Sequence, residues 1–170
     1  MNTDELRALQ APLKDRYRAD PADANITLRA HGSLDDSSLS CKVETGRAIA
    51  AAGLHPAAGG SGLELCSGDM LLEALVACAG VTLKAVSTSL GVAIRSGRVT
   101  AEGDLDFRGT LGVEKQAAVG FTDIRLSFEL DTDASPEQLA TLLKLTERYC
   151  VILQTLKRPP TLAATLTRAA

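Results

Sequence analysis

The chain has 170 residues, a formal net charge of −3, 45% hydrophobic residues and 23% charged residues. This balance excludes a disordered chain, and the length suits one globular domain with a sizeable core. The negative charge, the lack of basic runs longer than a pair, and an aromatic content of 3% argue against a nucleic-acid-binding surface.

The sequence also bears on compartment and metal content. Residues 1–5 lack the basic and apolar parts of a signal peptide, and the longest apolar stretch, residues 70–83, is too short to cross a bilayer. We therefore expect a cytoplasmic protein that does not enter a membrane. There its four cysteines should be thiols. Without a C-x-x-C pair, and with two histidines, the sequence predicts no metal site and no cofactor.

The N-terminal third predicts a helix, a hairpin and a loop. Apolar residues at helical spacing indicate a surface helix over residues 3–18. Alternation over 25–31, turn residues over 32–37 and a second alternation over 38–45 indicate a β-hairpin. The glycine-rich segment 53–62 matches no phosphate-binding motif, so we expect a loop there.

A long helix is predicted at the centre of the chain, over residues 70–90. Ser67 is its expected N-cap, Asp69 lies in its first turn, where the helix dipole favours an acid, and Gly91 ends it. Its first half is apolar on nearly all sides, so the helix should be buried on most sides.

The remaining chain predicts two long strands, a helix and a short strand. Residues 92–107 indicate a bent strand, and strict alternation over 121–130 indicates another. A capping box over 135–138 opens a helix that continues to about Tyr149, and residues 162–168 indicate a closing strand. This order predicts an α+β fold with mostly antiparallel sheet.

Two cysteines, Cys78 and Cys150, each lie on a predicted apolar helix. Helical thiols far apart in sequence suit a redox site formed where two helices meet. They also suit two ordinary core cysteines, because free cysteine is among the most buried residue types. Cys41 is expected in a strand core, whereas Cys66, near a helix start, is either an alternative thiol partner or a small loop residue.

The sequence resembles the OsmC/Ohr family of thiol-dependent peroxidases over residues 25–168. The segments that carry the resemblance are Gly59–Gly60, residues 69–78, residues 103–121 and residues 147–150. It implies one OsmC-like domain over residues 1–170, with the helix at 3–18 outside the shared core. It also implies an OsmC-like fold in which antiparallel sheets wrap two central helices in an intertwined homodimer.

The resemblance implies a mechanism as well. Cys78 would be the peroxidatic cysteine, whose thiolate attacks a hydroperoxide, and Cys150 would resolve the sulfenic acid as a disulfide. An aliphatic pocket would favour organic hydroperoxides. A dithiol, of the lipoyl type or another small one, would be the reductant.

Several positions depart from the family pattern. Asp69 occupies a glutamate position, whereas Ser67 and Val151 stand where proline is common. Burial would raise the pKa of the Cys78 thiol, so a cation is expected nearby, and Arg29 and Arg47 are the nearest candidates. Two other functions stay open beside the peroxidase: a non-catalytic module that binds a small apolar ligand, and a stress-associated structural protein.

Overall fold

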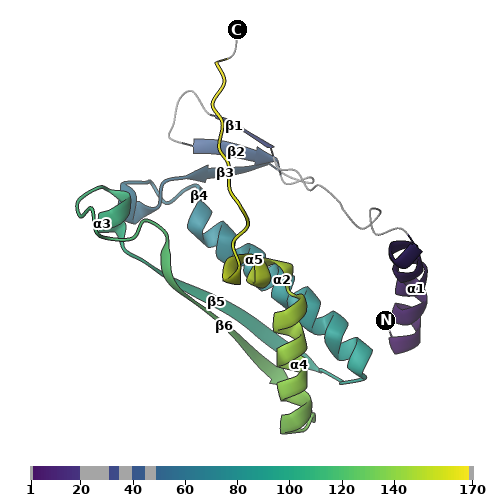
Figure 1. The fold of residues 1–170 in the computed structure, drawn as a ribbon. Helices are drawn as coiled ribbons and strands as arrows, with labels where there is room; N and C mark the ends of the chain where they lie inside the picture. The colour runs from purple at the N-terminus through teal and green to yellow at the C-terminus, as the bar shows by residue number, and fades with distance from the viewer. Residues whose placement is uncertain (1, 20–30, 35–39, 45–48, 169–170) are drawn as a thin grey trace.

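A computed structural model of the chain describes residues 2–19, 31–34, 40–44 and 49–168 (Figure 1). The chain contains both helices and strands. The helices are α1 (Thr3–Ala19), α2 (Ser67–Leu90), α3 (Phe107–Thr110), α4 (Pro136–Tyr149) and α5 (Val151–Lys157). The strands are β1 (His31–Leu34), β2 (Ser40–Glu44), β3 (Ile49–Gly53), β4 (Leu65–Cys66), β5 (Ser96–Leu105) and β6 (Phe121–Asp131).

The strands form two separate sheets, so the predicted α+β class is confirmed. One sheet has the order β1-β2-β3-β4, antiparallel except between β3 and β4, and the other is the antiparallel pair β5-β6. Figure 1 shows the β5-β6 pair running alongside α2, with the four-stranded sheet near the start of that helix. The two-stranded sheet packs against α2 on one face.

The predicted antiparallel hairpin is confirmed over the described residues, and its strand pairing reaches past residue 31. β1 covers His31–Leu34 and pairs with β2, with Leu34 opposite Cys41, so strand pairing extends into the predicted turn over 32–37. The predicted strand over 25–31 lies outside the described residues except for its last residue. β3 was not predicted because its Ala-rich sequence has little intrinsic preference for a strand, and pairing with β2 holds it.

The central helix is confirmed and begins three residues earlier than expected. Its N-cap is Cys66, whose extended backbone precedes the first helical residue, so the prediction of Ser67 as N-cap was wrong. Gly91 ends the helix in the left-handed conformation, at φ +69°, as its lack of a Cβ allows. At 24 residues, α2 could cross a membrane by length and composition alone, a test that the core helix of a soluble protein also passes.

The second half of the chain follows the prediction in part. The strand predicted over 92–107 is shorter, at Ser96–Leu105, and the short helix α3, Phe107–Thr110, was not predicted. β6 and the capping box of α4, in which Ser135 and Gln138 exchange hydrogen bonds, are confirmed. Residues 162–168 form no strand. Leu162 and Leu166 are 84% and 99% exposed, because no strand among the described residues pairs with this segment.

The core lies where α2 meets α4, α5 and the inner face of β5-β6. One buried cluster contains Leu75, Ala79 and Cys150, and a second contains Leu83, Val86 and Leu142. Burial of such side chains stabilises the fold by about 1.5–3 kcal/mol for each large apolar residue. The contact between α2 and α4–α5 therefore fixes the position of every side chain that faces it, including both helical cysteines.

Candidate active site

The structure brings Cys78 and Cys150 together. Cys78 lies in the middle of α2, and Cys150 lies between the end of α4 and the start of α5. A hydrogen bond joins the two side chains, and both cysteines are free thiols. Cys150 is fully buried beside Leu75 and Ala79, whereas Cys78 is half-buried. The pair thus has one accessible sulfur and one enclosed sulfur.

The surroundings of the pair are apolar. Side chains from the inner face of the two-stranded sheet and from α5 pack against the cluster that contains Cys150. They are Val99, Ala101, Ile124, Leu126, Phe128, Ile152, Leu153 and Leu156. The Cys150 sulfur is therefore shielded from bulk water, and a charge near these apolar side chains depends on local hydrogen bonds for its stabilisation.

Hydrogen bonds lower the pKa of the Cys78 thiol below its usual value. Burial alone raises this pKa, but donors from α5 and α2 more than offset it. The main donors are the backbone N–H of Ile152, the thiol of Cys150 and the backbone N–H of Val151. Thr82 contributes least, and its hydroxyl donates to the Cys78 backbone carbonyl at 2.7 Å. The groups that lower this pKa are all uncharged, and the expected cations, Arg29 and Arg47, lie outside the residues that the structure describes.

The pKa of the Cys150 thiol moves in the opposite direction. Burial raises it, the backbone N–H of Leu153 lowers it, and the neighbouring Cys78 raises it further. The net direction is upward. The arrangement therefore favours a thiolate at Cys78 and a protonated thiol at Cys150.

A break in the helix supplies the two backbone donors. Cys150 has φ −71° and ψ 108°, which is extended backbone, so α4 ends there and α5 starts with its own N–H groups unpaired within the helix. Val151 stands where the family resemblance led us to expect proline. Because proline has no N–H, this departure gives the site a donor.

The other predicted site residues lie elsewhere. Asp69 is exposed in the first turn of α2, nine residues before Cys78, and nine residues correspond to about two and a half helical turns. Its carboxylate therefore faces away from the thiol, and together with Glu73 it lines a different hollow, of about 470 Å³. Arg29 and Arg47 lie outside the described residues. Within the described ranges no cluster of His, Cys, Asp and Glu suits a metal ion.

Cys66 is also separate from the pair. It lines another cavity, of about 340 Å³, together with His55, Phe107 and Phe121. The His55 ring stacks on Phe107 at 5.0 Å, and its Nδ1 accepts a hydrogen bond from the Ala57 N–H. These contacts give His55 a structural place in the loop before α2.

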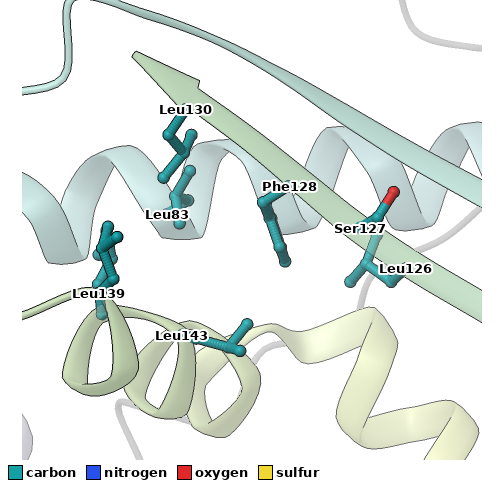
Figure 2. Close-up of a pocket in the computed structure, with 8 residues that line it drawn as sticks. Leu83, Leu126, Ser127, Phe128, Leu130, Leu139 and Leu143 are labelled. Atoms are coloured by element: carbon teal, nitrogen blue, oxygen red, sulfur yellow. The ribbon is translucent and has the colours of Figure 1, made fainter. Parts of the chain in front are cut away.

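Figure 2 shows an apolar groove whose lining is mostly leucine. It has a volume of about 360 Å³ and lies between α4, β6 and α2. Its lining is Leu83, Leu126, Ser127, Phe128, Leu130, Leu139, Leu142 and Leu143. Leu126 and Phe128 also pack against the cluster that contains Cys150, so the groove and the thiols share a wall.

Comparisons with known proteins agree with this fold. The family model for OsmC-like proteins matches residues 60–165, and the chain belongs to that family. A search of curated proteins gives no match.

Solved structures show the same fold at low sequence identity. An OsmC-like protein from Mycoplasma pneumoniae has a TM-score of 0.65 and 16% identity, over 79% of this chain and 90% of that one. An organic hydroperoxide resistance protein from Elizabethkingia anophelis has a TM-score of 0.62 and 15% identity, over 79% and 91%. An organic hydroperoxide resistance protein OsmC from Legionella pneumophila has a TM-score of 0.61 and 12% identity, over 79% and 93%.

Proposed function

We propose that the protein is a thiol-dependent peroxidase that reduces organic hydroperoxides, with Cys78 as the peroxidatic and Cys150 as the resolving cysteine. The observation that carries the proposal is the pairing of two thiols whose pKa values move apart, downward at Cys78 and upward at Cys150. Family membership and the names of two structural neighbours, both organic hydroperoxide resistance proteins, support the same reaction class.

The reaction has three steps. The Cys78 thiolate attacks the terminal oxygen of the hydroperoxide, the O–O bond breaks, and an alcohol leaves with a proton while Cys78 becomes a sulfenic acid. Cys150 then attacks the Cys78 sulfur, a disulfide forms, and the thiol proton leaves with the hydroxyl group as water. A dithiol reductant, of the lipoyl or another small type, reduces the disulfide and is itself oxidised.

The apolar groove supports a hydroperoxide with a hydrocarbon chain. Its lining is almost wholly leucine and phenylalanine, and it shares Leu126 and Phe128 with the thiol site. Such a groove favours an aliphatic tail over the small, strongly hydrated hydrogen peroxide.

The exposed face of α2 supports a homodimer. Leu71, Ala74, Ala77 and Val81 follow one another at helical spacing and are all exposed in the single chain, Val81 to 73%. Exposed apolar surface of this kind marks an interface in soluble proteins. We infer that a second copy covers this stripe, that two central helices meet there between the sheets, and that the dimer works in the cytoplasm.

Peroxide consumption tests the proposal. The wild type, supplied with a dithiol reductant, should consume an organic hydroperoxide, and Cys78→Ser should reduce the rate to background. Cys66→Ser is the matched control and should retain the wild-type rate, because Cys66 lines a different cavity. Normal turnover by Cys78→Ser would contradict the mechanism.

The same groove favours one second candidate, a module that binds a small apolar ligand without catalysis. In that case an apolar ligand would bind the wild type and Cys78→Ser equally, and neither would consume peroxide.

A further inference from the structure

Gln154 ties α5 to α4 across the break at Cys150. Its side-chain Nε2 donates a hydrogen bond to the backbone carbonyl of Glu147, at 2.7 Å, in a partly buried position. Side-chain amides near a helix end serve as substitutes for the backbone donors that the helix has lost. The Gln154 side chain therefore replaces a backbone hydrogen bond that is lost at the break.

The numbering of helical hydrogen bonds explains which groups the break releases. In a continuous helix the N–H of residue i bonds to the carbonyl of residue i−4, so Val151 would bond to Glu147 and Ile152 to Arg148. Cys150 still follows this rule, because its N–H bonds to the Thr146 carbonyl at 2.9 Å. The extended backbone at Cys150 ends the series at the next residue.

The released groups have new partners. The N–H groups of Val151 and Ile152 hydrogen-bond to the Cys78 sulfur, and the Glu147 carbonyl receives the Gln154 side chain in place of the Val151 N–H. The helical series then resumes at Gln154, whose N–H bonds to the Cys150 carbonyl at 2.9 Å. Gln154 therefore bonds to Glu147 through its side chain and to Cys150 through its backbone N–H.

We propose that Gln154 is a positioning residue for the Cys78 thiolate: by occupying the Glu147 carbonyl, it keeps the Val151 N–H free to bond the Cys78 sulfur. Without this side chain the Glu147 carbonyl is a partly buried acceptor that has lost its partner, and the donor that a continuous helix supplies to it is the Val151 N–H. Reclaiming that donor would extend α4 by one residue and withdraw the N–H from Cys78.

The ionisable groups around this contact are few. Cys150 is the titratable group that faces Cys78, and on the outer side Lys157 pairs with the Glu147 carboxylate at 3.0 Å. Lys157 lies on the same helix as Gln154 and also contacts Glu147, but it bonds to the carboxylate and not to the backbone carbonyl. A Lys157 variant is therefore a matched control for the Gln154 variants.

The test measures the thiolate itself. Alkylation of Cys78 by iodoacetamide, quantified on its peptide by mass spectrometry from about pH 5 to about pH 10, gives the midpoint of Cys78 ionisation. Gln154→Leu should move this midpoint upward and slow alkylation at neutral pH by about threefold to tenfold, with the plateau at high pH unchanged. Lys157→Ala should leave the midpoint where it is in the wild type.

A second variant covers the case in which Gln154→Leu does not fold. Gln154→Glu keeps the size of the side chain but offers no donor once ionised, so it should shift the midpoint in the same direction. A midpoint that matches the wild type in the folded Gln154 variants, or an equal shift in Lys157→Ala, would overturn the assignment. This inference rests on the proposed function. Alkylation by iodoacetamide does not involve a peroxide, so the experiment measures the positioning of the thiolate independently of peroxidase activity.

Discussion

Cys150 donates its thiol hydrogen to the Cys78 sulfur. Burial raises the pKa of both thiols, and hydrogen bonds outweigh this effect only at Cys78. Cys78 receives the N–H groups of Val151 and Ile152 from the break between α4 and α5. The α2 helix contributes the thiol and the helix break contributes most of its donors. Chemical reactivity at this site therefore depends on how α2 packs against α4 and α5.

The first prediction concerns the resolving step. Cys150→Ser should still react once with an organic hydroperoxide, because Cys78 keeps its backbone donors, but the sulfenic acid should then persist for lack of a resolving thiol. A sulfenic-acid-specific probe followed by peptide mass spectrometry should label Cys78 in this variant and little in the wild type. Equal labelling of both proteins would remove Cys150 from the resolving role.

The second prediction concerns pH. The midpoint for alkylation of Cys78 should lie below the usual thiol value of about 8.5, and that of Cys150 above it. Because the folded-state pKa of Cys78 is lowered, its contribution to stability is present above the unfolded pKa and is lost as pH falls through the folded pKa. The raised pKa of Cys150 acts the other way, and its contribution is lost as pH rises.

Thermal unfolding checks the signs of these two contributions. The difference in melting temperature between the wild type and Cys78→Ala should grow in favour of the wild type as pH rises from the folded toward the unfolded pKa of Cys78. A difference that stays constant with pH would mean that the folded state does not stabilise the thiolate.

The third prediction concerns the exposed stripe on α2. Val81→Asp should place a charge in the proposed contact between two copies and weaken association by about tenfold or more. Ala140→Asp, on the exposed side of α4, adds the same charge away from the stripe and should leave association unchanged. Sedimentation at several concentrations measures both, and a stable folded wild-type monomer at micromolar concentration would contradict the dimer.

The fourth prediction concerns Thr146, one helical turn before Cys150. Its side chain is 1% exposed and its hydroxyl has no hydrogen-bond partner among the described residues. A buried hydroxyl without a partner costs about 1–3 kcal/mol, so the isosteric Thr146→Val should raise the unfolding free energy by about 1 kcal/mol. Chemical denaturation measures the change. Thr146→Ser, which keeps the hydroxyl, should give no such gain, and destabilisation by Thr146→Val would show that the hydroxyl has a partner in solution.

Local sequence signals were sufficient for some elements. The alternation of β6 and the capping box of α4 specify their elements through neighbouring residues alone, and Gly91 marks the end of α2 because only glycine readily takes that conformation. β3 is different, since its Ala-rich sequence carries no such pattern and depends on its neighbour in the sheet.

The two sulfur atoms of the site could be predicted from the sequence, but the hydrogen-bond donors around Cys78 could not. Two cysteines on apolar helices, together with the family resemblance, indicated a Cys78–Cys150 pair. Nothing in the segment from Tyr149 to Ile152 marks a helix break, because it contains neither glycine nor proline. The break depends on contacts that the fold creates, among them those of Val151 with Cys78 and of Gln154 with Glu147.

The most direct test of the mechanism is the bond that forms on oxidation. A disulfide requires Cα atoms within about 7 Å, a demand that neighbouring side chains on packed helices can meet. Treatment of the reduced protein with one equivalent of an organic hydroperoxide, followed by peptide mass mapping without reduction, should give one Cys78–Cys150 bridge per subunit. A bridge between Cys78 and Cys66 would keep the peroxidase and replace the resolving residue, whereas overoxidation of Cys78 without any bridge would contradict the two-cysteine mechanism.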